Sequence, residues 1–104
     1  MPPRLSVIIP CYNSEATLGA QLSALAAQVC GYSWEVIVAD NGSRDGTIRV
    51  ANSFADRIPA LRVVDASARR GAAYARNAGA EDSHGTALLF LLWYVTPRTM
   101  FEGK

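Results

Sequence analysis

A short, continuous apolar run near the amino terminus constrains the fold of this chain more than any other feature. The segment at positions 5–13 reads LSVIIPCYN. Its apolar residues are consecutive and mostly β-branched, which is typical of a strand that helices cover on both faces. Pro10 has no amide hydrogen for a sheet ladder, so we expect pairing to weaken there. The run therefore predicts a buried strand of a parallel sheet, with Tyr12 and Asn13 at its carboxyl end, where open α/β sheets bind ligands.

Helical and strand patterns alternate along the rest of the chain. The apolar spacing predicts helices over 15–28, 47–55 and 72–80, and strands over 34–40, 61–65 and 86–95. Ser14 can cap the first of these helices. The inner face of the second is predicted to carry Ile48, Val50, Ala51 and Phe54. Strands that alternate with helices form right-handed βαβ units, so the pattern predicts an α/β fold with three layers, α/β/α.

Length and charge exclude several classes of protein. The chain has 104 residues, half of them hydrophobic, and a formal net charge of +1. This composition does not favour disorder or a polyanion-binding surface, so we expect no nucleic-acid partner. The longest apolar run, at 87–95, is far shorter than the ~20 residues that span a bilayer, and no signal-peptide pattern opens the sequence. We therefore expect a cytoplasmic protein without a transmembrane segment.

The two cysteines and the single histidine do not indicate a metal site or a disulfide. Cys11 and Cys30 lack metal-ligand spacing, and they are predicted at opposite edges of the sheet, too far apart for a bond. We expect both to be small buried thiols. His84 lies between Ser83 and Gly85 in a predicted loop, where a solvated side chain is expected.

The predicted strand ends do not match the common phosphate-binding motifs. The glycines of a dinucleotide fingerprint or a Gly-Lys-Ser triphosphate loop would follow the first strand, and neither is present. Asp40 ends the second strand, where a dinucleotide fold keeps its ribose-binding acid. Without the glycines, that residue alone is a weak signal.

Three segments, taken together, resemble a known family. They read SVIIPCYNSE at 6–15, EVIVADNGSRDGT at 35–47 and ARNAG at 75–79. Their order and spacing are similar to the amino-terminal half of family 2 glycosyltransferases with the GT-A fold, and the resemblance covers the chain up to about Leu91. It implies a Rossmann-like, mostly parallel sheet with strand order 3-2-1-4. It also implies a single nucleotide-diphospho-sugar-binding domain over 1–104, truncated at its carboxyl end.

The resemblance implies a nucleotide-sugar donor, commonly a uridine diphosphate sugar, and gives five residues a role in binding it. These residues are Pro10, Tyr12, Glu15, Asp40 and Arg70. Pro10 and Tyr12 would line the pocket for the base and ribose, and Glu15 would lie near the ribose or the helix start. Asp40 would accept a hydrogen bond from the imide nitrogen of the base, and Arg70 would reach the base or the phosphates.

Other interpretations of these side chains stay open. Asp40 can cap the turn that follows it, and Arg69 and Arg70 can be an ordinary solvated pair. Asp45 is predicted to cap the second helix because it directly precedes Gly46 and the helix start. Two further residues, expected to fasten a helix to the loop that follows it, are Arg76 and Asn77.

The metal site of the family has no counterpart in the sequence. Family members hold a divalent cation, Mg²⁺ or Mn²⁺, with two aspartates spaced by one residue after the fourth strand. Here that place reads LWYV at 92–95, and no carboxylate lies anywhere from Ala87 to Phe101, so this segment offers no charged oxygen ligand. The half of the family that carries the general base and the acceptor surface is also absent. We therefore assign no catalytic or metal-ligating residue. Of two explanations, a catalytically complete protein of unusual type and a truncated or frame-altered piece of a longer transferase, the sequence favours the second.

These features leave alternative functions. In the first, the chain is the donor-binding half of an inverting, metal-dependent glycosyltransferase that moves a sugar to a hydroxyl of an unidentified acceptor. In the second, it is a non-catalytic nucleotide-binding or protein-interaction module, which can self-associate through an uncovered fourth strand. A signalling receiver domain has a similar element order, but it needs acidic neighbours and a lysine, and the only lysine is Lys104.

Overall fold

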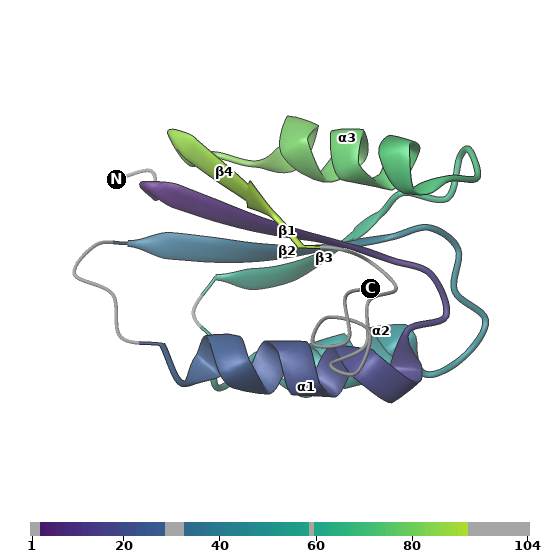
Figure 1. Ribbon diagram of the computed structural model, residues 1–104, viewed down its shortest axis with the longest axis horizontal. Coiled ribbons are helices and arrows are strands. Elements are labelled where there is room, and N and C mark those ends of the chain that lie inside the picture. Colours follow the sequence, from purple (N-terminus) through teal and green to yellow (C-terminus); the bar gives the residue numbers. More distant parts are fainter. Residues whose placement is uncertain (1–2, 29–32, 59, 92–104) are drawn as a thin grey trace, which may run out of the picture.

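The computed structural model describes residues 3–28, 33–58 and 60–91, and within them one parallel sheet of four strands. The strands are β1 (Leu5–Cys11), β2 (Trp34–Asp40), β3 (Leu61–Asp65) and β4 (Ala87–Phe90). They lie in the order β3-β2-β1-β4, so β1 has β2 on one side and β4 on the other (Figure 1). The predicted parallel sheet and its strand order are confirmed.

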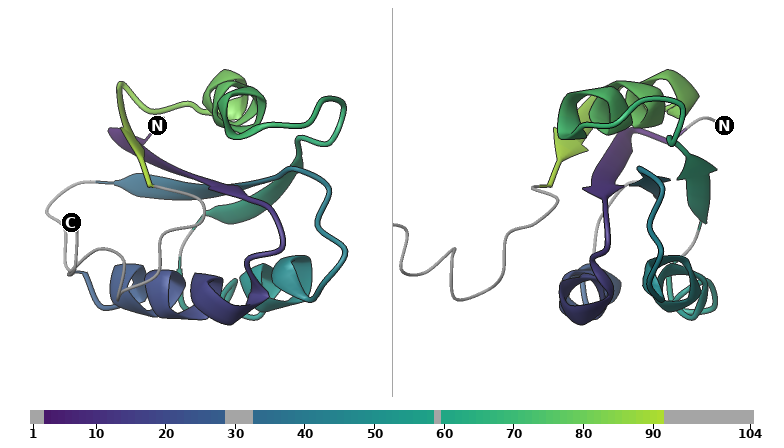
Figure 2. Two further views of the ribbon diagram at one scale, coloured as in Figure 1. Left: turned by 45° about the vertical axis from the view of Figure 1, so that its right-hand side comes forward. Right: turned by 90° about the vertical axis from the view of Figure 1, so that its right-hand side faces the viewer.

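Helices cover both faces of this sheet. α1 (Glu15–Ala26) and α2 (Thr47–Asn52) lie side by side on one face, and α3 (Ala72–Asp82) lies on the other (Figures 1 and 2). This is the predicted α/β/α arrangement of three layers. Among the described residues, no helix combines the length and the apolar character that crossing a bilayer requires.

The consecutive apolar residues of β1 contribute side chains to the core on both faces of the sheet, because neighbouring side chains along a strand point to opposite faces. Val7 and Ile9 pack with Leu18 and Leu22 of α1 in the larger core cluster. Ile8 points to the other face, where it lies against α3. All three β1 residues are buried. Burial on both faces explains why the strand shows no apolar and polar alternation.

Gly79 brings α3 close to the sheet. A Cβ atom at this position would lie 2.6 Å from Ile8 Cγ2 and 3.3 Å from Ala39 Cβ, closer than ordinary van der Waals contact. Gly79 is buried inside α3 and not at its end. Its missing side chain therefore lets the helix backbone pack directly on β1 and β2.

Several element boundaries differ from the predicted ones. α1 ends at Ala26 and α2 at Asn52, both earlier than predicted, while α3 continues to Asp82. After α2 the chain proceeds in turns, so apolar spacing alone overestimates the length of that helix. β4 runs from Ala87 to Phe90, so Thr86 and Leu91, predicted to belong to this strand, lie just outside it; the predicted strand positions 92–95, and Cys30, lie outside the described residues.

Three side chains lie elsewhere than predicted. Ile48 is exposed, whereas the buried residues of α2 are Thr47 and Ala51. Residues four apart share a helix face, and the next residue along is turned about 100° away, which takes Ile48 out of the core. Arg76 and Asn77 lie exposed in the middle of α3, so they do not fasten a helix to a loop.

Pro10 limits strand pairing on one side of β1 only. The register with β2 continues past it to Cys11, whereas the register with β4 ends at Ile8. Residues two apart on a strand face the same neighbour, and the Ile8 carbonyl accepts the amide of Leu91 from the β4 side. The missing amide hydrogen of Pro10 therefore faces that side. The expected weakening of strand pairing therefore affects the β4 side of β1, and the pairing of β1 with β2 continues past Pro10.

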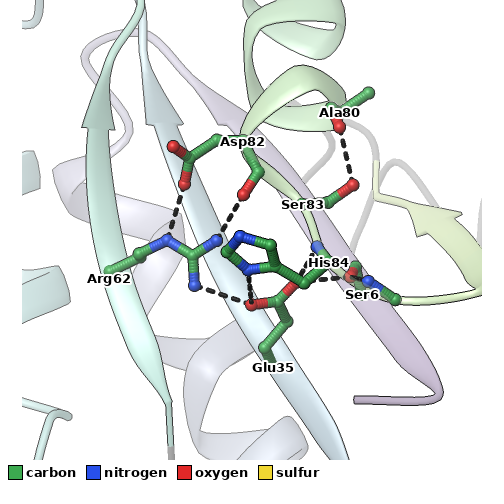
Figure 3. Close-up of polar contacts among 8 residues, drawn as sticks. Ser6, Glu35, Arg62, Ala80, Asp82, Ser83 and His84 are labelled. Carbon is green, nitrogen blue, oxygen red and sulfur yellow. Dashed lines mark hydrogen bonds and ion pairs between the residues drawn. The ribbon is translucent and has the colours of Figure 1, made fainter. Parts of the chain in front are cut away.

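A buried carboxylate fixes the amino-terminal edge of the sheet. Glu35 of β2 has a side chain that is 3% exposed and accepts three hydrogen bonds (Figure 3). The donors are the Ser6 hydroxyl at 2.6 Å, the His84 backbone amide at 2.7 Å and the Arg62 guanidinium at 2.6 Å. Burial alone raises the pKa of Glu35, but these hydrogen bonds and the Arg62 charge hold it below its ordinary value.

Arg62 extends this network to α3. Its Nε and Nη2 atoms donate to the side chain and the backbone carbonyl of Asp82, each at 2.6 Å (Figure 3). The His84 ring is exposed, as predicted, with its Nδ1 3.9 Å from a Glu35 oxygen. Together these contacts tie the end of α3 and the loop before β4 to β2 and β3, at the edge remote from the carboxyl ends of the strands.

Candidate functional site

The carboxyl ends of β1, β2 and β3 meet at one edge of the sheet, as parallel strands require (Figure 1). The strand registers place Asp40 of β2 between Cys11 of β1 and Asp65 of β3. Three loops leave this edge, at 12–14, 41–46 and 66–71. The residues that the sequence predicts to bind a ligand lie on these strand ends, on two of the loops and at the start of α1.

The Asp40 side chain caps a turn and also keeps one oxygen free of hydrogen bonds. The residue is 4% exposed. Its Oδ2 accepts the backbone amides of Gly42 at 3.2 Å and Ser43 at 3.0 Å. In the described part of the chain, its Oδ1 is the one buried side-chain nitrogen or oxygen without a hydrogen-bond partner. Leaving a buried carboxylate oxygen unpaired is costly, so this atom marks a place where a ligand donor would bind favourably.

Tyr12 and Arg70 contact each other beside this strand end. The Arg70 guanidinium carbon lies 4.3 Å from the centroid of the Tyr12 ring, which is a cation–π contact. Tyr12 follows β1 and Arg70 lies in the loop before α3, so the fold brings the two residues together from distant parts of the chain. Arg70 is exposed but is not simply solvated. The pair presents an aromatic ring and a positive charge at the edge of the sheet.

Asn41, for which the sequence predicts no role, joins the strand ends. The residue is 2% exposed. Its Nδ2 donates to the carbonyls of Ala66 and Arg69, both at 2.7 Å, and its Oδ1 accepts the Gly71 amide at 2.9 Å. Its backbone amide donates to the Cys11 carbonyl at 2.7 Å. An asparagine in a turn-forming segment carries no sequence signal for this role, because its partners are distant along the chain.

Reciprocal hydrogen bonds join the first two loops. The Asn13 amide donates to the Ser43 hydroxyl and the Arg44 amide donates to Asn13 Oδ1, both at 2.8 Å. Asn13 has a φ of 50°, a left-handed conformation that asparagine adopts more readily than most residues. The Ser14 hydroxyl bonds to the Tyr12 backbone and not to the start of α1, so the predicted side-chain cap is wrong. These bonds hold the loop after β1 against the loop after β2.

Asp45 and Glu15 connect the amino termini of α1 and α2. Asp45 accepts the Thr47 amide at 3.0 Å and the Glu15 amide at 3.1 Å, which are the first residues of α2 and α1. The N-cap residue of α2 is Gly46, so Asp45 holds the helix start from the residue before the cap and is not the predicted cap itself. The Glu15 carboxylate accepts the Gly46 amide at 3.0 Å and pairs with Arg49 at 3.2 Å. Glu15 thus lies at the helix start. Its contact with a ribose stays a prediction.

Cys11 lies at the end of β1 as a neutral thiol. It is buried and free, as predicted. Burial, and after it the charge of Asp40, raises the pKa of the Cys11 thiol to about 12. The thiolate is the reactive and metal-binding form, so Cys11 fits neither a nucleophile nor a metal ligand. Pro10 beside it is also buried, and its contact with a base stays a prediction.

The described residues do not fit a divalent cation. No group of three or more His, Cys, Asp or Glu side chains lies together within residues 3–28, 33–58 and 60–91. At the strand ends, one oxygen of Asp40 caps a turn, and one oxygen of Asp65 accepts two hydrogen bonds from Ser67. Positions 92–95, where the acidic motif is expected, lie outside the described residues and carry no carboxylate. We therefore derive no metal-dependent step.

The sequence matches a family and individual members of it. The model of the family described as Glycosyl transferase family 2 matches residues 6–91. The uncharacterized glycosyltransferase YfnE of Bacillus subtilis is 44% identical over 87 residues, which are 84% of this chain and 22% of that protein. Glycosyltransferase AglE of Haloferax volcanii is 40% identical over 90 residues, which are 86% of this chain and 30% of that protein. The chain thus spans about a fifth to a third of the length of these relatives.

Solved structures share the fold. The crystal structure of S. aureus TarS 1–349 in complex with UDP matches with a TM-score of 0.80 and 28% identity, covering 96% of this chain and 30% of that chain. The complex of TarS 1–349 with UDP-GlcNAc matches with a TM-score of 0.70 and 26% identity, over the same shares of the two chains. The family match covers residues 6–91, which are most of the sequence. This chain belongs to glycosyl transferase family 2.

Proposed function

We propose that the strand-end site binds the nucleotide part of a nucleoside diphosphate sugar, with uridine as the nucleoside. The observation that carries this proposal is Oδ1 of the buried Asp40, which has no donor within the described residues. The imide N–H of uracil is such a donor, and a hydrogen bond from it to a carboxylate is charge-assisted. The UDP complex of TarS supports the proposal, because that protein shares this fold.

The neighbouring residues suit the other parts of the ligand. The Tyr12 ring offers an apolar face to a planar base. The Arg70 guanidinium, 4.3 Å from that ring, offers donors to a base carbonyl or to a phosphate. In the proposal Pro10 lines the base side of the pocket, and Glu15 lies on the ribose side at the start of α1.

The hydrogen-bonding pattern of the site predicts which base it selects. Uracil presents a donor at the nitrogen between its two carbonyls, whereas cytosine presents an acceptor at the equivalent atom. A carboxylate oxygen attracts the first and repels the second. The amides of Gly42 and Ser43 hold Oδ2 of Asp40. In Asp40→Asn these amides would keep the side-chain oxygen in that place and turn the Nδ2 donor toward the ligand.

Isothermal titration calorimetry of UDP and CDP with the wild-type chain and with Asp40→Asn tests the proposal. The wild-type chain should prefer UDP. Asp40→Asn should lose roughly ten- to a hundredfold in UDP affinity, about 1.5–3 kcal/mol, and should shift its preference toward CDP. Its melting temperature without ligand should change little, because the turn keeps its cap.

The same substitution at an exposed position, Asp56→Asn, is the matched control and should alter neither affinity. Intact UDP affinity in Asp40→Asn, combined with a strongly lowered melting temperature, would identify Asp40 as a turn cap only. Absence of UDP binding to the wild-type chain would refute the proposed nucleotide site.

We further propose that residues 1–104 form one donor-binding domain that is incomplete at its carboxyl end. The whole transferase would move the sugar to an acceptor hydroxyl with inversion. Two findings support this proposal: the family match, and the small part of each relative's length that this chain covers. A cytoplasmic location belongs to the same proposal, since Cys11 is kept as a free thiol, as is usual in reducing compartments.

A second proposal concerns self-association through β4. This strand pairs only with β1 among the described strands, and its large apolar side chains Leu88, Leu89 and Phe90 are exposed. An apolar edge strand can pair with the same strand of a second copy. Sedimentation velocity should show dimers or larger species in the wild-type chain and fewer in Leu89→Lys. A monomeric wild-type profile at high concentration would contradict this proposal.

A further inference from the structure

We infer that Asn41 is a positioning residue, which holds the loop at 66–71 so that Arg70 lies over the Tyr12 ring. The effect of Asn41 on nucleotide affinity rests on the proposed function. Its effect on the position of Arg70 concerns the chain without ligand. Asn41 bonds to the residues on both sides of Arg70 and to the residue before Tyr12. It acts on the Tyr12–Arg70 pair through these neighbours.

The Asn41 side chain uses both donors and its acceptor on this loop. Nδ2 donates to the carbonyls of Ala66 and Arg69, and Oδ1 accepts the Gly71 amide. Asn41 is 2% exposed, so its side-chain atoms depend on these three bonds for their hydrogen-bond partners. Two of the three partners, Arg69 and Gly71, directly flank Arg70. The backbone on both sides of the exposed Arg70 is therefore fixed.

The same residue also holds the end of β1, directly before Tyr12. The Asn41 backbone amide donates to the carbonyl of Cys11, the residue before Tyr12, at 2.7 Å. Asn41 thus joins both members of the cation–π pair to one point at the end of β2. This arrangement accounts for a 4.3 Å contact between an exposed, flexible arginine and a tyrosine from another loop.

Gly71 shows that the loop conformation is specific. Its φ is 130°, in the region that residues with a Cβ rarely adopt, yet a Cβ there would meet no atom within 4 Å. Space therefore does not require glycine; the backbone conformation does. Since Asn41 accepts the Gly71 amide, the two residues define one loop geometry together. Gly71→Ala is consequently a second way to displace Arg70 without a steric clash.

The first test measures the Tyr12 environment in the absence of ligand. The chain is labelled with 3-fluorotyrosine, and Tyr12→Phe assigns the ¹⁹F signal of Tyr12. Arg70→Ala should shift this signal, and Asn41→Ala should shift it in the same direction. Asn77→Ala, an exposed asparagine of α3, is the matched control and should leave it in place. A Tyr12 signal that moves in Arg70→Ala but not in Asn41→Ala would overturn the inference.

The second test is a double-mutant cycle on UDP affinity measured by calorimetry. Arg70→Ala and Asn41→Ala should each lose roughly five- to tenfold in affinity, and the double variant should lose no more than Arg70→Ala alone. Losses that multiply in the double variant would mean that Asn41 acts independently of Arg70. Gly71→Ala takes the place of Asn41→Ala in both tests if that variant does not fold.

The two tests separate this inference from the proposed function. If the wild-type chain does not bind UDP, the proposed function fails, and the ¹⁹F signal of Tyr12 still decides whether Asn41 positions Arg70. If UDP binds but the Tyr12 signal does not shift in Asn41→Ala, the proposed nucleotide site is supported and the positioning role of Asn41 is refuted.

Discussion

The Arg62 guanidinium lies 2.6 Å from the carboxylate of Glu35, and the two side chains are 33% and 3% exposed. The pair lies at the sheet edge remote from the proposed nucleotide site. Taking a carboxylate out of water is costly, and here hydrogen bonds from Ser6 and His84 help to offset that cost. Removing one member leaves the other with an unpaired charge or donor, so the network can be tested by single substitutions.

Glu35→Gln should lower the free energy of unfolding by about 1.5–3 kcal/mol, because it removes charge-assisted hydrogen bonds to a poorly solvated site. Urea denaturation monitored by circular dichroism measures the change. The same substitution at exposed Glu81 of α3 is the control and should stay within about 0.5 kcal/mol of the wild-type chain. Equal effects at the two positions would show that the buried network adds nothing to stability.

Acid should destabilise the wild-type chain more than Glu35→Gln. The pKa of Glu35 is lowered from its ordinary value of 4.5, so the folded chain keeps this carboxylate ionised where the unfolded chain takes up a proton. Its contribution to stability is complete above that ordinary value and is lost as the pH falls through the lower folded value. Melting temperatures between neutral pH and pH 3 check this. Parallel curves for the two proteins would contradict it.

Gly79→Ala should destabilise the fold by about 1–3 kcal/mol, although alanine favours helices. The added Cβ would lie 2.6 Å from Ile8 Cγ2 and push α3 off the sheet. Gly19→Ala in α1 is the matched control, since its Cβ would meet only Val50 Cγ1 at 3.8 Å. That variant should be neutral or more stable by up to about 1 kcal/mol. A stabilised Gly79→Ala in thermal denaturation would refute the close approach.

Cys11 should resist alkylation in the folded chain. Burial and the charge of Asp40 raise the pKa of its thiol to about 12, so almost no thiolate forms at pH 8. Iodoacetamide treatment followed by mass spectrometry of the Cys11 peptide should show little modification without urea and full modification in urea. Rapid labelling without urea would mean that the end of β1 opens readily.

UDP affinity should not depend on a divalent cation. No group of three or more metal-binding side chains lies together in the described ranges, and the sequence has no carboxylate from Ala87 to Phe101. Calorimetry with manganese and with a chelator should give the same dissociation constant. Tight binding that disappears on chelation would show that carboxylates elsewhere in the chain hold a metal on the phosphates.

Much of the fold can be predicted from residues that are close together in the sequence. β1 and β2 consist of consecutive apolar residues and are separated by a helix with leucines on one stripe. This pattern predicts buried parallel strands, because an apolar residue at each strand position indicates that both faces are covered. Helix ends are less predictable. The apolar spacing of α2 continues past Asn52, where the helix ends, into the turns that follow it. Ile48 shows the same limit: apolar spacing predicts it in the core, whereas its side chain is exposed on α2.

The order of the elements, the family resemblance and the place of Asp40 at a strand end can be derived from the sequence alone. The contacts between distant groups become visible in the folded chain: Arg70 lies over Tyr12, Asn41 bonds to the loop before α3, and Arg62 pairs with Glu35. These partners lie 25 or more residues apart, beyond the reach of any periodic pattern. The folded chain also shows that one Asp40 oxygen caps a turn and the other has no partner. That distinction depends on how three strands and their loops pack around a single buried carboxylate.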